Sequence, residues 1–133
     1  MHHSEFQVTD NVAPNERLQV DLSEGKIGGT FNVVHFIDKD TKQFVFYLPS
    51  LQLSGYGKTA SKAEHMLKFQ LDDFFNGLLE MQEALVQQTL LALGWEKIKL
   101  KKGFTHTIID IENELQQFNV EIGSVQLQML ETI

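Results

Sequence analysis

The residues that most resemble a chemical motif are 54–59 (SGYGKT), which end in Gly-Lys-Thr. A phosphate-binding P-loop has this ending directly before a helix, and its backbone amides point at the anion. The P-loop also needs a glycine five positions before the glycine of Gly-Lys-Thr, but Gln52 stands there. A tight turn over Gly55 and Gly57 with a helix cap at Thr59 is the competing interpretation, so nucleotide or phosphate binding stays an alternative.

A second candidate is basic, because four of the eleven Lys and Arg residues fall within 97–102. Lys97, Lys99 and Lys101 alternate with apolar residues, so in a strand they would project from one face and could contact phosphates. Lysines on an edge strand also prevent sheets from aggregating, which is the commoner reason for this pattern. Protection of a sheet edge is therefore the favoured interpretation of 97–102, and nucleic-acid contact stays an alternative. With two aromatic side chains that could be exposed, the predicted interaction residues are Tyr56, Lys58, Trp95, Lys97, Lys99 and Lys101.

The remaining polar residues do not predict catalysis, a cofactor or a metal. The carboxylates that cluster are Asp72 with Asp73, Glu80 with Glu83, and Asp110, Glu112 and Glu114. Acid–base catalysis needs two carboxyls in one cleft, but neighbouring helix positions point about a quarter-turn apart, and the pair Glu80 and Glu83 is typical of a solvated helix face. His35, His65 and His106 are scattered and lack the spacing of a zinc site. The sequence contains no cysteine, which excludes disulfides and thiolate chemistry and suits a reducing cytoplasm.

The composition favours one acidic globular domain. The 133 residues give room for a single core. Eighteen Asp and Glu against eleven Lys and Arg leave a net charge of −7, which repels nucleic acid and anionic membranes. No apolar run is long enough to cross a membrane, and residues 1–14 lack the pattern of a secretory signal. We therefore expect a cytoplasmic protein without a membrane partner.

The first half of the chain predicts strands. Residues 1–16 are polar and aperiodic and predict a loose lead-in. Alternation over 18–22 predicts a short strand, and the glycine-rich residues 23–29 predict a turn. The β-branched and aromatic run 30–37 predicts a strand covered on both faces. With the dense apolar run 43–48 it predicts a β-hairpin with a five-residue loop.

The middle of the chain predicts two helices. Pro49 and Ser50 end the second strand, 51–53 alternates briefly, and Thr59 or Ser61 can cap a helix. Spacings of three and four place one apolar stripe on that helix, formed by Ala63, Met66, Leu67, Leu71, Phe74, Phe75 and Leu78. The turn-prone pair Asn76-Gly77 predicts a break, followed by a second helix over 78–93 that Gly94 ends.

Residues 95–133 predict a C-terminal extension of strands and one short helix. The alternation at 97–101 predicts a strand, and 107–110 open a helix whose inner face is Ile108, Ile111, Leu115 and Phe118. A last strand over 120–129 needs a bulge near Gly123 to restore its alternation. The whole chain thus predicts a single α+β domain over 1–133, with a small antiparallel-rich sheet packed on a long helix.

Residues 43–79 resemble the HicB-like family, the antitoxin side of HicA–HicB toxin–antitoxin pairs. The family has an aromatic strand ending in proline, a glycine-containing turn, and a helix that opens with Gly-x-Thr and small residues. With the strand before it, the resemblance spans 30–79, and the matching positions are Phe46, Pro49, Leu51 or Leu53, Gly55, Gly57, Thr59 and Ala63.

The resemblance implies a degenerate ribonuclease H-like core without catalytic carboxylates, and an acidic surface that neutralises a small basic toxin. Family antitoxins commonly add a C-terminal DNA-binding segment, which 95–133 does not resemble. We therefore expect a non-enzymatic domain that binds a protein or associates with itself as a homodimer. Exposed sheet edges would form its interface, because an unpaired strand offers backbone groups to a partner strand.

Overall fold

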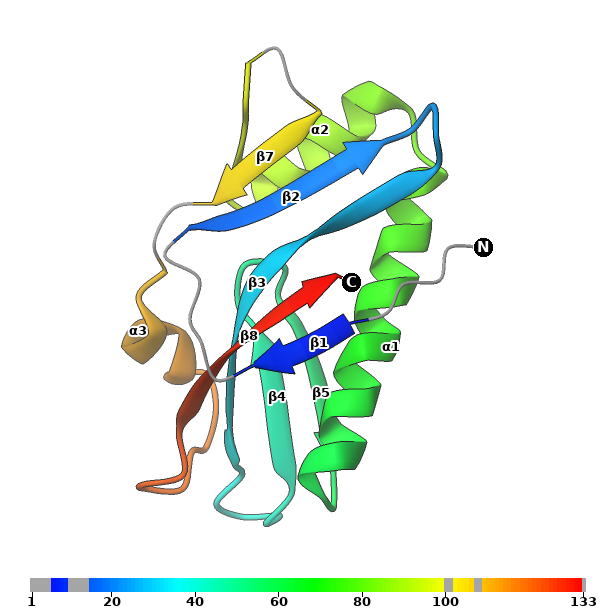
Figure 1. Ribbon diagram of the computed structural model, residues 1–133. Helices are drawn as coiled ribbons and strands as arrows, with labels where there is room; N and C mark the ends of the chain where they lie inside the picture. The colour runs from blue at the N-terminus through cyan, green and yellow to red at the C-terminus, as the bar shows by residue number, and fades with distance from the viewer. Residues whose placement is uncertain (1–5, 10–14, 100–101, 107–108, 133) are drawn as a thin grey trace.

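A computed structural model of the chain describes residues 6–9, 15–99, 102–106 and 109–132 (Figure 1). These residues form eight strands and three helices, which confirms the predicted α+β class. In chain order the elements are β1 (Phe6–Thr9), β2 (Glu16–Asp21), β3 (Lys26–Ile37), β4 (Phe44–Leu48), β5 (Leu53–Gly57), α1 (Ala60–Leu79), α2 (Glu83–Ala92), β6 (Trp95–Lys97), β7 (Gly103–His106), α3 (Ile111–Leu115) and β8 (Gln126–Thr132).

The twelve-residue strand β3 is the spine of one antiparallel sheet with the order β1-β8-β3-β2-β7-β6. β2 pairs with its first part, at 26–30, and β4 pairs with its last part, at 34–37. β8 pairs with 30–35 and so overlaps both of them. A strand has two edges, and β8 occupies one edge of β3, so β2 and β4 must both pair with the other edge. They lie one after the other along it, and the sheet forks between them.

The predicted burial of β3 on both faces is confirmed, because the sheet carries a core on each side. The main core lies under α1 and α2 and includes Phe31, Val33, Phe46, Leu67 and Phe75. On the opposite face, which we call the α3 face, a second core forms from Val34, Phe36, Val45 and Tyr47 with Ile111, Leu115, Phe118 and Val120. Figure 1 shows α1 alongside β5 and α3 on the other side of the sheet.

The long helix α1 is capped as predicted, since the Thr59 side chain accepts a hydrogen bond from the backbone N–H of Lys62 at 3.1 Å. The predicted break at Asn76-Gly77 is wrong, and the helix continues to Leu79. Continuation keeps Leu78 fully buried in the main core, and this outweighs the helix-breaking tendency of one glycine. The chain turns after Leu79 instead, so α2 begins at Glu83, and it ends before Gly94, which has a φ of 94°.

Both ends of the chain differ from the sequence prediction. Residues 6–9 belong to β1, which pairs with β8, so the predicted loose lead-in is wrong there. The turn after β2 covers only 22–25, and Gly28 and Gly29 belong to β3. The inner face predicted for α3 is confirmed for Ile111, Leu115 and Phe118, while Ile108 lies outside the described residues.

The last strand begins at Gln126, six residues later than predicted. Gly123 has a φ of 81° and lies in a turn, where the sequence predicted a bulge within a strand. All three strands of 95–133 join the same sheet, so the C-terminal extension completes the domain.

Alanine substitutions at Gly55 and Gly77 test how closely α1 packs on β5. A Cβ atom at Gly55 would lie 2.3 Å from the Ala63 carbonyl oxygen and 2.4 Å from the Leu67 nitrogen, both backbone atoms. We expect Gly55→Ala to lower the free energy of unfolding by about 3 kcal/mol, because the helix must move away. The matched control is Gly77→Ala, where a Cβ meets nothing within 4 Å. It should raise stability by about 0.5–1 kcal/mol. Urea unfolding measures both, and equal effects would contradict the close packing.

Candidate functional site

The Gly-Lys-Thr stretch does not form a phosphate loop. Gly55 and Gly57 belong to β5 and pair with Phe46 and Phe44 of β4, so the predicted turn over these glycines is wrong. Only Lys58, which is exposed, and Thr59 separate the strand from α1. The glycines allow α1 to approach, and the Thr59 hydroxyl is used as the helix cap. The geometry therefore gives no support to nucleotide binding at 55–59.

The predicted lysine strand is shorter than the alternation indicates. β6 covers only Trp95–Lys97, Lys99 lies in the following turn, and Lys101 lies outside the described residues. The chain must turn there because β7 returns antiparallel to β6, with Lys97 opposite Phe104. Lys97 and Lys99 therefore do not share one strand face, which corrects the prediction for these two residues. Lys102 lines the same hollow as Lys97, from the start of the segment that leads into β7.

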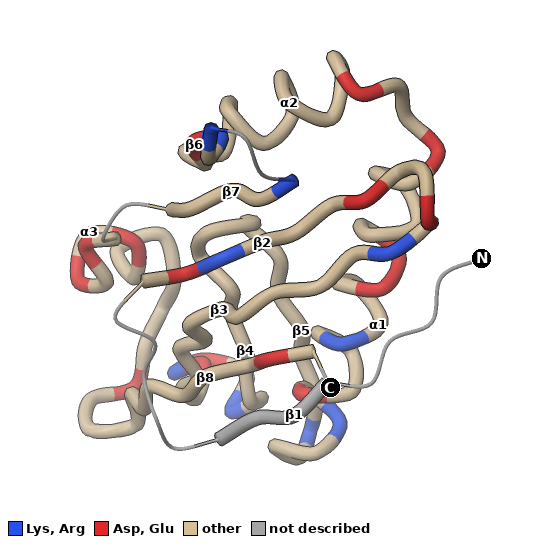
Figure 2. Tube along the Cα trace, turned by 45° about the horizontal axis from the view of Figure 1, so that its top comes forward, with Lys and Arg blue, Asp and Glu red and all other residues tan. Residues whose placement is uncertain are grey.

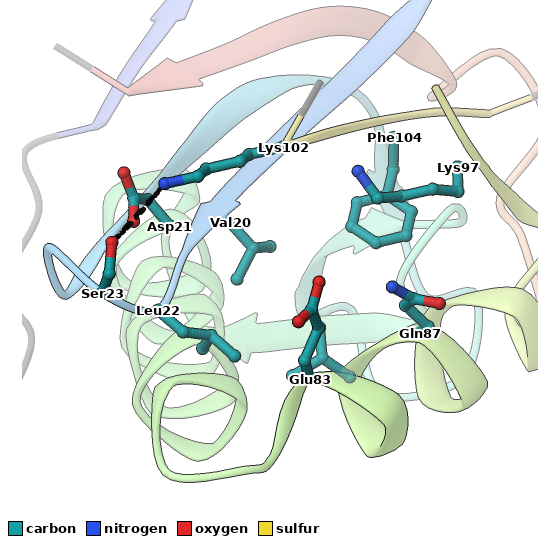
Figure 3. A pocket seen from close by; sticks show the side chains of 10 residues that line it. Val20, Asp21, Leu22, Ser23, Glu83, Gln87, Lys97, Lys102 and Phe104 are labelled. Atoms are coloured by element: carbon teal, nitrogen blue, oxygen red, sulfur yellow. Dashed lines mark hydrogen bonds and ion pairs between the residues drawn. The ribbon is translucent and has the colours of Figure 1, made fainter. Parts of the chain in front are cut away.

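Lys97 and Lys102 line a hollow of about 170 Å³, which we call the lysine hollow (Figure 3). Three segments far apart in the sequence meet around it: the end of β2, the first half of α2, and the β6–β7 hairpin. Val20, Leu22, Val86 and Phe104 supply its apolar lining, and its polar lining is Asp21, Ser23, Glu83, Gln87, Lys97 and Lys102.

The charges at one side of the lysine hollow are held by the protein itself. Lys102 Nζ lies 3.1 Å from Asp21 Oδ1 and 3.5 Å from Ser23 Oγ. The same carboxylate oxygen accepts hydrogen bonds from Ser23 Oγ at 2.7 Å and from the Glu24 backbone N–H at 3.1 Å. The Ser23 hydroxyl, then the Glu24 amide and Lys102, lower the pKa of Asp21 to about 2. Asp21 thus stays ionised and fixes Lys102.

The rest of the hollow is balanced in charge as well. Lys97 Nζ lies 5.3 Å from the centre of the Phe104 ring, a cation–π contact. Glu83 points into the hollow from α2 (Figure 3). Two lysines thus share the hollow with two carboxylates, and Figure 2 shows red and blue interspersed along these segments. A phosphate backbone needs a basic stripe, so this arrangement weighs against nucleic-acid contact.

Trp95 is the predicted interaction residue that the structure contradicts, because its side chain is only 1% exposed. Its indole Nε1–H donates to the Ser50 carbonyl oxygen at 2.9 Å. The ring packs edge-on against Phe31 and His106, with centroid distances of 6.0 and 4.9 Å. Trp95 therefore holds β6 to the main core and is not available to a partner.

A buried carboxyl lies in the same region. Glu16 is 6% exposed, and its Oε2 accepts a hydrogen bond from Ser50 Oγ at 2.5 Å. It stands opposite His106, whose Nε2 lies 2.7 Å from the Leu93 carbonyl oxygen. Burial raises the pKa of Glu16, and the Ser50 hydroxyl, the Asn32 backbone and His106 partly offset this. The group joins four segments and is closed to ligands. Residues 1–16 are polar and aperiodic, so nothing in their pattern predicts a buried position for Glu16.

An accessible apolar surface lies where α1 meets β5. Tyr56, Met66 and Phe69 are 43%, 40% and 71% exposed. The outward backbone N–H of Tyr56 donates to Met66 Sδ at 3.4 Å, and sulfur is a weak acceptor. Among the described strands β5 pairs only with β4, so its other edge has no strand partner. We call these three side chains and the outer edge of β5 the β5 edge surface.

The sequence anticipated this surface only in part. Tyr56 is exposed, as expected for an interaction residue. The prediction that Met66 faces the core is wrong, because α1 packs with its Ala63–Leu67–Leu71 side against the sheet and Met66 wraps around the strand edge. Phe69 was missed, although an aromatic residue off the apolar stripe was the available signal.

A second hollow, of about 320 Å³, adjoins the β5 edge surface on the α3 face. The Tyr47 hydroxyl donates to Glu114 Oε2 at 3.1 Å. Gln117 Nε2 donates to the Tyr47 hydroxyl oxygen and to Glu114 Oε2, each at 3.3 Å. We call it the Glu114 hollow, and its lining residues are Tyr47, Gln52, Ser54, Tyr56, Glu114, Gln117 and Phe118.

The histidines and carboxylates do not assemble into a metal site within the described ranges, where no three such residues are placed to share an ion. His35 stacks on Phe46 with the rings 6° from parallel and 4.5 Å apart, and burial lowers its pKa. It is a core histidine. None of the described helices is both long and apolar enough to cross a membrane.

Comparison of the chain with protein-family models, curated proteins and solved structures finds no match. The resemblance to the HicB-like family therefore stays a prediction.

The buried carboxyl predicts a pH dependence of stability. Because the folded pKa of Glu16 is raised above its ordinary value of 4.5, its contribution to the free energy of unfolding is full below pH 4.5 and is lost as pH rises through the folded pKa. Glu16→Gln keeps a polar group beside Ser50 and removes this loss. We expect the variant to gain stability relative to the unchanged protein as pH rises above 4.5, in urea unfolding. A constant difference across pH would contradict the assignment.

The pH dependence of stability expected from Asp21 has the opposite sign to that expected from Glu16. Its folded pKa of about 2 lies below the ordinary value of 3.8, so its contribution is present above pH 3.8 and is lost as pH falls through the folded value. Asp21→Asn should therefore lower stability near neutral pH and have little effect near the folded pKa. Thermal unfolding over this range measures it, and a larger loss in acid would refute the network with Lys102.

Proposed function

We propose that this chain is a non-enzymatic protein-binding domain that docks its partner on the β5 edge surface. The observation that carries the proposal is an unpaired strand edge with Tyr56 and Met66 partly exposed along it, and with Phe69 exposed on the adjoining helix. Tyr56 and Met66 are in contact through backbone N–H and sulfur, and Phe69 follows Met66 one turn along α1. Aromatic residues and methionine are enriched at protein interfaces, whereas isolated exposed apolar residues are ordinary.

The two parts of the surface offer a partner different kinds of interaction. The outer edge of β5 presents backbone donors and acceptors, which an extended segment can pair with as an added strand. Phe69 is 71% exposed, so covering its ring removes a large apolar area from water. Met66 is flexible and can adapt its side chain to a docked surface.

The net charge indicates the kind of partner. The chain carries −7, and a second copy carries the same charge, so electrostatics opposes a homodimer and favours a basic protein. The HicB-like resemblance implies the same class, a small basic protein of the toxin type. We propose such a partner in the cytoplasm, with self-association as the competing outcome of the test.

A pair of charge-introducing variants tests the docking site. Phe69→Asp places a carboxylate in the β5 edge surface, and Leu91→Asp is its matched control on α2, since Leu91 is 66% exposed but lies outside this surface. The tagged full chain is used to capture partners from source cells. A captured protein is then purified, and its direct binding to each variant is measured by calorimetry. We expect Phe69→Asp to weaken binding about thirtyfold, as for a hot-spot residue, with Leu91→Asp unchanged.

The same measurement can overturn the proposal. A partner that binds both variants as tightly as the unchanged chain would exclude the β5 edge surface as the docking site. Light scattering measures the oligomeric state of the chain alone. If it shows a dimer that Phe69→Asp converts to a monomer, the occupant of the β5 edge surface is a second copy of the chain and not a basic partner.

A further inference from the structure

The Glu114 hollow lies beside the strand edge that a docked segment would use. Ser54 is opposite Tyr47 and Tyr56 is opposite Val45 in the β4–β5 register. Tyr47 and Val45 belong to the second core, so Ser54 and Tyr56 direct their side chains to the α3 face. In an added strand, the residue that pairs with either of them points to this same face. One side chain of a docked strand therefore lies over the Glu114 hollow.

The chemistry of the hollow suits a cationic side chain. The Glu114 carboxylate accepts hydrogen bonds from the Tyr47 hydroxyl and the Gln117 amide, which are both neutral. Neither bond cancels its charge, and within the described residues no Lys or Arg lies at ion-pair distance from Glu114. Tyr56 supplies a partly exposed aromatic ring at the rim, on which an aliphatic stem or a guanidinium can pack.

The surroundings strengthen the same preference. α3 is acidic along its length, with Glu112 and Glu114 in its first turn (Figure 2). The tyrosine and glutamine hold the Glu114 carboxylate in place, so a cation meets a positioned acceptor without the usual loss of side-chain freedom. A charge-assisted hydrogen bond of this kind is about twice as strong as a neutral one.

We propose that the Glu114 hollow is a subsite for one lysine or arginine side chain of a partner segment that adds as a strand to β5. This inference rests on the protein-binding function proposed above and specifies what that site recognises. The residue next to the basic one points to the other face, where it meets Met66, and it is therefore apolar. The recognised segment is extended and has a basic residue between apolar ones.

Charge also sets the position of the basic residue along β5. Lys58 directly follows the strand and disfavours a second cation at that end. Ser54 lies toward the other end of β5 and on the rim of the hollow. The lysine or arginine therefore pairs opposite Ser54. The Met66 sulfur must leave the Tyr56 N–H as the strand adds, which costs little because a thioether accepts hydrogen bonds only weakly.

Two peptides test the subsite on the intact chain. The first is acetyl-Thr-Val-Lys-Val-Thr-Val-amide, and the second has norleucine in place of lysine, which keeps the stem and removes the charge. Titration into the ¹⁵N-labelled chain should shift the resonances of Ser54, Tyr56 and the Gln117 side-chain amide. We expect the norleucine peptide to bind about tenfold more weakly, the effect of losing one charge-assisted contact.

Matched variants separate the subsite from general attraction to an acidic protein. Glu114→Gln should reduce the affinity for the lysine peptide about tenfold and leave the norleucine peptide unchanged. Glu112→Gln removes the same charge from an exposed position on α3 outside the hollow. Because solvent and salt screen an exposed charge, this substitution should weaken binding of the lysine peptide by less than about twofold and leave that of the norleucine peptide unchanged. A lysine peptide N-methylated at the residues that pair with β5 should lose binding, whereas N-methylation at the alternate residues should not.

Each result decides the matter. Equal binding of the two peptides, equal effects of the two glutamate variants, or shifts remote from Ser54 and Tyr56 would overturn the subsite. Absence of binding by the lysine peptide would overturn it as well. The Phe69→Asp and Leu91→Asp variants bear on the docking function separately, because they are measured with the captured protein and not with peptides. If the captured partner fails to bind Phe69→Asp but binds Glu114→Gln as tightly as the unchanged chain, the docking function is supported and the basic subsite is excluded.

Discussion

The fork in the sheet is the constraint on which the rest of the structure depends. β2 and β4 share one edge of β3, so the start of one strand and the end of the other face each other near Asn32. Strand ends carry backbone groups without ladder partners, and burying them unpaired is costly. The Ser50 carbonyl oxygen accepts from the Trp95 indole, and the Ser50 hydroxyl donates to Glu16. The fork thus closes around Ser50, which is held by Glu16 of β2 and by Trp95 of β6.

Local sequence patterns predicted the parts of the fold that local physics determines. The β-branched and aromatic run of β3 and the apolar spacing of α1 are one-dimensional signals of burial, and both predicted the buried side chains apart from the exposed Met66. The pairing of residues 6–9 with β8 joins the two ends of the chain, and four residues carry too little pattern to indicate it. The continuation of α1 through Gly77 depends on the buried position of Leu78, which is a tertiary effect.

The candidate site was harder to predict than the fold because exposure depends on how elements are packed. Trp95 and Tyr56 are both aromatic residues beside glycines, yet one is buried by α2 and the core while the other lies on a sheet edge. Lys102 and Asp21 are far apart in the sequence, and only the β2–β7 pairing brings them together. Glu114 acquires its setting from Tyr47, a residue of another element. The order of the strands in the sheet brings these residues together, and the spacing of the residues in the sequence does not indicate it.

The contact between Met66 and the Tyr56 amide bears on how the protein survives while unbound. An open strand edge is a template for aggregation, and natural proteins carry side chains or bulges that protect such edges. A thioether over the outward amide hides it from other chains, yet releases it readily because the bond is weak. A charged blocker would protect the edge more firmly and would also repel an apolar partner. Methionine at this position would thus protect the edge from aggregation and still leave it open to the partner strand proposed above.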